Sequence, residues 1–202
     1  MARIIDKEEK RCDIALAAMD IFCEKGIALT TIDDIAKSAG VAKGTIYLYF
    51  KNKEEIIFAI WDKIFTLHIE TFERSIKPTM CAKEKILTFF NFSAFGKKSS
   101  DIMRLYHHFV SAMLVDTTGL YAAYFEQFFQ QDYDLILSCL KEGVASGEFK
   151  EVDVHLLTQS IVFAIKGVLI KSKANDLNFD EMQKLLTTQI TFLLENFTRE
   201  IA

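Results

Sequence analysis

The sequence predicts an all-helical protein of about nine helices, and three observations predict this fold class. The chain of 202 residues holds a single proline and eight glycines, so little interrupts long helices. Apolar residues recur three and four positions apart along most of the chain, between residues that cap or end helices. The sequence contains no alternating apolar and polar run bounded by turns, so strands are not expected.

The first helix is expected over residues 9–25, and Gly26 is expected to end it. Ile27 and Leu29 follow, and we expect both to join the core of the next two helices. The apolar face of the first helix consists of four residues at helical spacing, Ile14, Ala18, Ile21 and Phe22.

Residues 31–53 carry the most specific pattern in the chain. Thr31 is expected to cap a short helix with Asp34 at its third position, and Gly40 is free to adopt the left-handed conformation that ends it. A second short helix then begins, whose Ile46 and Phe50 are expected to face inward. This order is typical of a helix-turn-helix, in which the second helix enters a DNA major groove.

The residues of the second short helix suit base edges. Gly44 has no side chain, which lets the helix approach DNA closely. Thr45 can bond a base or touch a thymine methyl, and Lys43 can reach guanine O6 and N7 or a phosphate. Tyr47 and Tyr49 present hydroxyl groups on long rigid side chains. These residue types at this spacing point to contacts with double-stranded DNA.

Phosphate contacts are expected at both ends of the segment, from Thr31 with the first helical amides and from Lys53. The segment 31–53, with its core Gly-Val-x-Lys-Gly-Thr-Ile-Tyr-x-Tyr-Phe-x-Asn-Lys, resembles the DNA-binding domain of TetR-type bacterial transcriptional regulators. The resemblance implies DNA-backbone contacts at Thr31, Tyr47 and Lys53. It also implies four positions that face the groove, Lys43, Gly44, Thr45 and Tyr49.

A long fourth helix is expected to follow, because Asn52 can cap it and Glu55 can complete a capping box. Pro78 marks its end. We therefore expect two domains without a flexible linker, residues 1–52 for DNA binding and residues 53–202 for ligand binding and dimerisation. The fourth helix is suited to carry a movement from one domain to the other.

The remaining pattern stays helical. Further helices are expected over residues 81–96, 100–115, 119–146, 154–173 and 179–199. The last two have wide apolar stripes, which can pack within one chain or form half of a four-helix bundle across a two-fold axis. A helix-turn-helix generally needs two copies on a palindromic operator, so we expect a homodimer through these two helices.

Aromatic side chains crowd the middle of the chain. In the family this region surrounds an effector pocket, and the resemblance implies a repressor. From the aromatic residues themselves we expect a small, largely apolar or aromatic effector that releases the protein from its operator. The alternative is a filled core, in a regulator controlled by a protein partner or not regulated at all. The candidate effector-binding residues are Trp61, Phe65, His68, Phe89, Phe92, Met103, Tyr106, His107, Tyr124, Phe125 and Phe128.

Charge excludes a protein that coats nucleic acid by bulk attraction. The net charge is −4, and residues 1–53 carry nine Lys/Arg against eight Asp/Glu, so +1. DNA affinity must therefore come from a few placed residues.

Other classes find little support in the sequence. Four dispersed cysteines predict a reduced, cytoplasmic protein, with a thiol sensor left open. The charged N-terminus predicts no signal peptide, and no segment predicts a membrane span. No metal-ligand spacing, phosphate loop or nucleophile elbow is present, so neither a cofactor nor an enzyme is expected.

Overall fold

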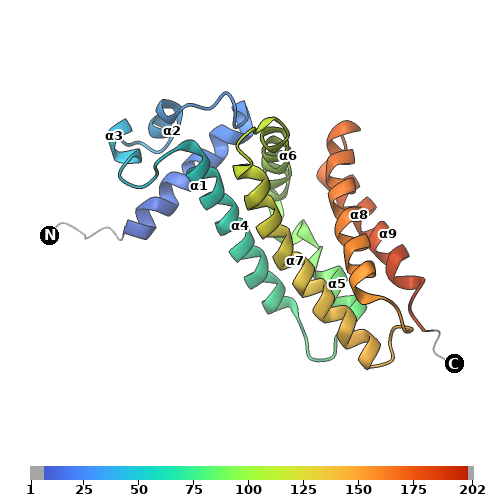
Figure 1. The fold of residues 1–202 in the computed structure, drawn as a ribbon. Helices are drawn as coiled ribbons and strands as arrows, with labels where there is room; N and C mark the ends of the chain where they lie inside the picture. Colours follow the sequence, from blue (N-terminus) through green and yellow to red (C-terminus); the bar gives the residue numbers. More distant parts are fainter. Residues whose placement is uncertain (1–6, 200–202) are drawn as a thin grey trace. The chain divides into compact units, whose positions relative to one another are not determined.

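The computed structural model describes residues 7–199, without the side chains of Ala94, Lys97 and Phe128. This range holds nine α-helices and one short 3-10 helix, η1 (Phe92–Lys98). It contains no strand, and its isolated bridge joins Phe149 to Thr198. The predicted all-helical fold class is confirmed (Figure 1). The helices are α1 (Lys7–Lys25), α2 (Ile32–Ser38), α3 (Lys43–Ile46), α4 (Lys53–Ser75), α5 (Ala82–Phe89), α6 (Ser99–Val115), α7 (Leu120–Ala145), α8 (Val154–Ala174) and α9 (Phe179–Glu195).

The chain divides into two compact units. The first runs to Glu70 and also takes in Arg104–Thr118, and the second comprises Thr71–Met103 and the chain from Gly119 onward. The first unit is thus larger than the expected domain of residues 1–52, because it adds most of α4 and of α6. The backbones of α4 and α6 each continue from one unit into the other.

The first unit is built around α1. This helix packs against α2, which packs against α3. The ring of His108, on α6, lies against Gly26, where a Cβ atom would stand 3.1 Å from its Nδ1. Gly26 also has φ of 78°, so glycine fits this position for two independent reasons. The fully buried side chains include Ile14, Phe22, Ile35, Ile46, Ile56 and Ile57.

The prediction for Leu29 is wrong. Ile27 is buried as expected, but Leu29 is 76% exposed, and the buried residue is Thr30. The hydroxyl of Thr30 donates to the carbonyl of Gly26 at 2.7 Å, and the Thr30 amide donates to the same oxygen at 3.2 Å. This tight turn points Thr30 inward and Leu29 outward, because a turn does not keep the helical spacing on which the prediction rested.

The predicted helix over residues 81–96 is also too long. The structure ends α5 at Phe89, and Asn91 accepts a bond from the Ser93 amide to open η1. Gly96 has φ of 59° inside η1, so the backbone is not helical there. An Asn side chain that bonds the following backbone competes with helix continuation, which explains the early end.

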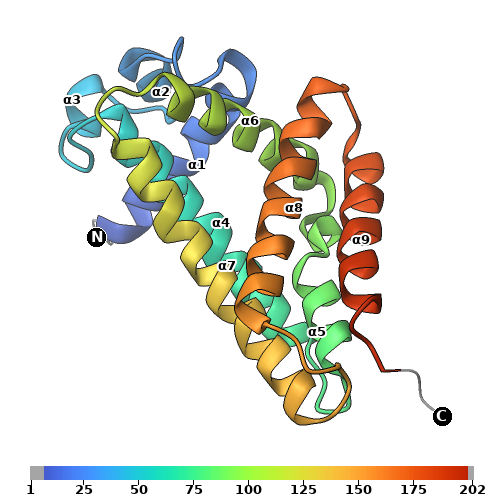
Figure 2. The same ribbon diagram turned by 45° about the vertical axis from the view of Figure 1, so that its right-hand side comes forward.

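The second unit consists mainly of long helices. Helix α7 packs against α8, α8 packs against α9, and α5 packs against α7 and α9. Figure 2 shows α8 and α9 side by side. Gly143 of α7 faces the ring of Phe149 so closely that no Cβ would fit. The last helix ends at Glu195, before the predicted residue 199, because Phe197 and Arg199 bond the turn at residues 148–150.

One described helix, α8, is long and apolar enough to cross a membrane by length and composition alone, which the sequence analysis did not expect. Its most apolar window has mean hydropathy 1.4 and is 33% buried. The same helix carries Lys166, Lys171 and Lys173. Within its unit it contacts α7 and α9, and its outward face is apolar at Leu156, Phe163 and Ile170.

Candidate nucleic-acid interface

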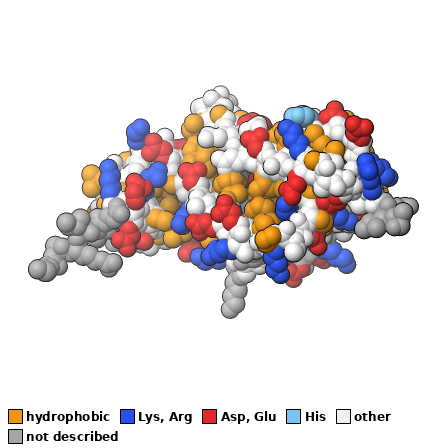
Figure 3. All heavy atoms as spheres, turned by 90° about the horizontal axis from the view of Figure 1, so that it is seen from below, with side chains coloured by type: hydrophobic (Ala, Val, Ile, Leu, Met, Phe, Trp, Pro, Cys, Tyr) orange, Lys and Arg blue, Asp and Glu red, His pale blue; other side chains and the backbone are white. Residues whose placement is uncertain are grey.

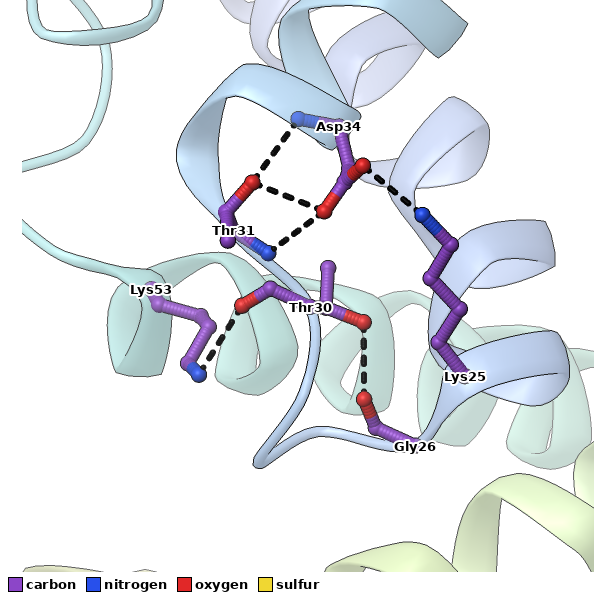
Figure 4. A network of polar contacts seen from close by, with 6 residues as sticks. All are labelled: Lys25, Gly26, Thr30, Thr31, Asp34 and Lys53. Carbon is purple, nitrogen blue, oxygen red and sulfur yellow. Dashed lines mark hydrogen bonds and ion pairs between the residues drawn. The ribbon is translucent and has the colours of Figure 1, made fainter.

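The start of α2 is held by the predicted capping box. The Thr31 hydroxyl accepts the Asp34 amide at 3.2 Å, while the Asp34 carboxylate accepts the Thr31 amide at 3.0 Å and the Thr31 hydroxyl at 2.7 Å (Figure 4). The Lys25 ammonium of α1 lies 2.8 Å from the other carboxylate oxygen. Hydrogen bonds from Lys25 and Thr31 hold the pKa of Asp34 well below its usual range. This network fixes the first turn of α2 on α1.

The turn between α2 and α3 depends on Gly40. Its φ is 63°, and the Val41 amide donates to the Ala36 carbonyl at 3.0 Å. Helix α3 is a single turn of four residues, with Ile46 fully buried inside it and Phe50 buried just beyond it. The predicted inward positions of Ile46 and Phe50 are confirmed. These anchors fix which face of α3 points outward.

The outward face of α3 carries the residues predicted to meet bases. Lys43 and Gly44 are exposed, as is Tyr47 just after the helix, whereas Thr45 and Tyr49 are half-buried. No atom lies within 4 Å of a Cβ placed at Gly44, so the backbone is open to a close approach. The structure thus brings these five residues together on one short segment of the first unit.

Lys53 has a role that the sequence did not indicate. Its ammonium donates to the carbonyls of Ile27, Ala28 and Thr30, at 2.6, 3.3 and 3.1 Å. Figure 4 shows it beside the Thr30 carbonyl, directly before the cap of α2. Lys53 therefore ties the start of α4 to the loop that precedes α2, and its contact with a phosphate stays a prediction.

Asn52 caps α4 as predicted, since the Glu55 amide donates to its side-chain oxygen at 2.9 Å. The second half of the expected capping box is shifted by one residue. The Glu55 carboxylate accepts the amide of Lys51 at 2.8 Å, and it lies 3.8 Å from the Lys51 ammonium.

The sequence analysis did not identify Asp33 and Leu48 as residues of the candidate DNA-binding surface. Asp33, in the first turn of α2, lies 3.0 Å from the Lys43 ammonium, and this hydrogen bond raises the pKa of Lys43. Leu48 is exposed beside Tyr47. The separation of ten residues between Asp33 and Lys43 spans a turn, so no helical periodicity links them. The exposure of Leu48 could have been predicted from the sequence, because Leu48 falls outside the apolar face set by Ile46 and Phe50.

The candidate effector residues of the first unit include Trp61, which is buried. Its ring meets Tyr106 and Phe109 edge to face, with centroids 6.4 and 5.8 Å apart. His68 is 9% exposed, and burial lowers its pKa to about 4, so the ring is neutral at pH 7. Phe65 and His107 are half-buried.

Two candidates of the second unit, Phe89 and Phe125, are buried and contact other aromatic rings. Phe89 is buried and lies edge to face with Phe72 and Phe90, at 5.2 and 4.8 Å between centroids. Phe125 lies edge to face with Phe129, with ring centroids 4.4 Å apart, and the Lys166 ammonium lies 4.3 Å from the centre of the Phe129 ring. Phe92, Met103 and Tyr124 are half-buried. The side chain of Phe128 lies outside the described part of the structure.

The structure gives no support for a thiol sensor at Cys81 or Cys139, or for a metal site among the described residues. Burial raises the pKa of Cys81 and raises that of Cys139 to about 11, so neither thiol favours its reactive thiolate form. Across the described residues, no three His, Cys, Asp or Glu side chains are grouped to hold a metal ion.

Known proteins resemble this chain in family and in fold. The family model "Bacterial regulatory proteins, tetR family" matches residues 14–60. The "Fatty acid metabolism regulator protein" of Bacillus subtilis is 32% identical over 178 residues, which cover 86% of this chain and 89% of that protein.

Solved structures share the fold. The transcriptional regulator FadR from Bacillus subtilis, in complex with stearoyl-CoA, has a TM-score of 0.73 and 28% identity, covering 92% of this chain and 98% of that one. A TetR transcription regulator from Haloarcula marismortui has a TM-score of 0.80 and 15% identity, covering 95% of this chain and 100% of that one. This second likeness concerns the fold alone.

An all-helical chain with a capped helix-turn-helix in its N-terminal quarter defines a DNA-binding regulator of transcription. This chain belongs to the TetR family of bacterial transcriptional regulators. Its matched relatives are regulators and not enzymes.

Proposed function

We propose that this protein is a homodimeric repressor that binds a palindromic operator in the cytoplasm and is released by a small, largely apolar effector. The observation that carries the DNA-binding site is the outward face of α3, where Lys43, Gly44 and Tyr47 stand exposed over buried Ile46 and Phe50. Residues 1–52 form the DNA-binding domain in this proposal, and residues 53–202 form the ligand-binding and dimerisation domain.

Each residue of the site has a distinct part. Lys43 bonds guanine O6 and N7, Thr45 contacts a neighbouring base, and Gly44 lets the α3 backbone come close. Tyr49 also faces the groove. Thr31, Tyr47 and Lys53 contact the DNA backbone, although Thr31 and Lys53 already have structural bonds that hold the loop and the cap in place.

The dimer forms through α8 and α9. Leu156, Phe163 and Ile170 are exposed seven residues apart on α8, and Phe192 is exposed on α9. A seven-residue spacing keeps apolar side chains on one stripe of a helix, as in the seam of a helical bundle. Exposed phenylalanines on two helices that pack side by side favour burial against a second copy of the chain.

The effector we propose has a long apolar tail, such as a long-chain acyl-CoA. The Bacillus subtilis structure contains stearoyl-CoA, and its chain is 28% identical to this one. Within the second unit, the aromatic residues around Phe89 and Phe125 supply apolar surface for such a tail.

One observation favours an alternative, control by a protein partner with a filled core. Leu114 and Val115, at the end of α6, are 75% and 77% exposed. Adjacent exposed apolar side chains of this kind suit a protein contact.

The DNA-binding site is tested with Lys43→Ala and Tyr47→Ala. An operator is first selected from a random duplex library with the wild-type protein. We expect each variant to bind this operator about five- to 150-fold more weakly, because each loses a base or phosphate contact worth about 1–3 kcal/mol. Lys43→Ala should also lower the slope of log affinity against log salt. Unchanged affinity together with an unchanged salt slope would sink the assignment.

The effector proposal is tested by melting the protein with stearoyl-CoA and a panel of apolar compounds. A ligand that binds only the folded chain at about 100 times its Kd adds about 2.7 kcal/mol of stability, so the melting temperature should rise clearly. The stabilising ligand should also weaken operator binding. If no compound stabilises the protein, the filled-core alternative is favoured.

A further inference from the structure

Most lysines around the DNA-binding segment already have a partner in the free protein. Lys25 pairs with Asp34, Lys43 with Asp33 and Lys51 with Glu55, at 2.8, 3.0 and 3.8 Å. Lys53 donates to three backbone carbonyls. With only +1 net charge over residues 1–53, the segment offers DNA few uncompensated cations.

The pair between Lys43 and Asp33 differs from the others in position. Lys43 opens α3 and Asp33 lies in the first turn of α2, so their contact crosses the turn of the helix-turn-helix. Both side chains are solvent-exposed, at 53% and 57%. Asp34, by comparison, belongs to the capping box and bonds Lys25. The carboxylate of Asp33 thus shares the exposed surface with the ammonium group that we assign to bases.

We propose that Asp33 is a specificity-determining residue, which neutralises Lys43 in the free protein and disfavours DNA that offers only phosphates. This rests on the proposed role of Lys43. Non-specific binding comes from phosphate neutralisation with release of counterions, so a paired lysine contributes little to it. A guanine offers two acceptors, O6 and N7, and a lysine aligned with them regains more than it loses on leaving an exposed carboxylate.

A carboxylate near the groove also acts directly. Like charges repel, and the repulsion between Asp33 and a phosphate is felt at every DNA sequence. This direct repulsion weakens binding to operator and non-operator DNA alike, so it leaves the specificity ratio unchanged. The discrimination that we assign to Asp33 therefore comes from its pair with Lys43.

The experiment uses Asp33→Asn, which keeps the size of the side chain and removes its charge. Binding is measured by fluorescence anisotropy to a 30-base-pair duplex of random sequence and to the selected operator, over a salt series. We expect Asp33→Asn to bind the random duplex roughly two- to fivefold more tightly, the range that corresponds to an exposed ion pair. The salt slope should steepen by about 0.9, as for one more neutralised phosphate. Affinity for the operator should rise less than affinity for the random duplex, so the ratio of the two affinities should fall.

Two controls separate the pair from general charge. Asp20→Asn makes the same change at an exposed position of α1. Its affinity for the random duplex should rise only by the small amount that one lost negative charge causes, and by less than in Asp33→Asn. In a Lys43→Ala background, Asp33→Asn should lose most of its effect, because the lysine it releases is gone. Melting curves for each variant verify equal folding.

Each outcome decides a different claim. If Asp33→Asn matches Asp20→Asn, or keeps its full gain without Lys43, or binds the random duplex more weakly than wild type, the specificity role of Asp33 is overturned. If Lys43→Ala leaves operator binding unchanged, the proposed DNA-binding site itself fails, which is a separate result.

Discussion

Among single residues, the two adjacent aspartates of α2 show how neighbouring side chains take different tasks. Asp34 builds the cap and bonds α1 through Lys25, so its removal would loosen the whole segment. Asp33 takes no part in the cap and instead forms an ion pair with Lys43 on the next helix. Substituting Thr31 by Ala should cost about 1 kcal/mol through the lost N-cap, since the hydroxyl satisfies the Asp34 amide.

Two buried ionisable residues give opposite pH dependences of stability. Burial lowers the pKa of His68 from 6.5 to about 4. Between these two pH values the ring is protonated in the unfolded chain and neutral in the folded chain. The contribution of His68 to the free energy of unfolding is fully present above pH 6.5. It falls by roughly 3 kcal/mol as the pH decreases toward 4. Burial raises the pKa of Asp132 from 3.8 to about 7, against the nearby Lys166, so its contribution is lost as pH rises from about 4 to 7.

We therefore expect the wild-type profile to be flatter than either variant profile. In Asp132→Asn, the free energy of unfolding should rise with pH between 4.5 and 6.5, because only the His68 effect remains. In His68→Gln it should fall over the same interval. Urea denaturation at a series of pH values measures both. Parallel profiles for the wild type and the two variants would contradict the assigned protonation states.

The residues that sequence reasoning placed correctly are those governed by local rules. The Thr31 cap, the left-handed Gly40 and the inward Ile46 depend on neighbours within a few positions, so the sequence reveals them. The bond of Lys53 to the loop at residues 27–30 and the pair of Lys43 with Asp33 depend on tertiary contacts. A single sequence without aligned homologues carries no signal for contacts of this kind.

Among the helices, the ones with clear caps were predicted best. Asn178 and Asp153 begin α9 and α8 where the sequence placed them, because each side chain bonds the first free amides. The break after α5 was missed since the apolar spacing continues past Phe89 into η1. Apolar periodicity alone does not distinguish one long helix from two short ones joined by a bend.

Helix α3 offers a test that separates folding from DNA binding. Gly44 has open space around it and needs no left-handed backbone, so Gly44→Ala should keep the fold and add up to about 1 kcal/mol of stability. The added methyl group should hold α3 away from the bases and weaken operator binding at least about tenfold. Melting and anisotropy on the same sample measure both effects. Full operator affinity in this variant would show that α3 does not lie against the bases.

For the molecule as a whole, charge and apolar surface point to different partners. Figure 3 shows basic and acidic side chains interspersed on the face in view, in keeping with a net charge of −4. In the proposed dimer, DNA binding depends on a few residues used twice, once in each copy of the chain. The exposed apolar stripe of α8 is the surface that we propose for that pairing, and it also explains why this helix resembles a membrane span in composition.

The central claim is that two copies of the α2–α3 unit, joined through α8 and α9, bind one operator. The most direct measurement is sedimentation of Phe163→Glu, alone and with the selected operator, beside Leu114→Glu as a matched exposed control. Phe163 is 62% exposed in the single chain, so the charge should not disturb folding but should be buried in a dimer. We expect a folded monomer that binds the operator at least about tenfold more weakly, while Leu114→Glu stays dimeric and binds as two chains per duplex. A Phe163→Glu protein that remains dimeric, or a monomer that binds the operator with full affinity, would contradict the claim.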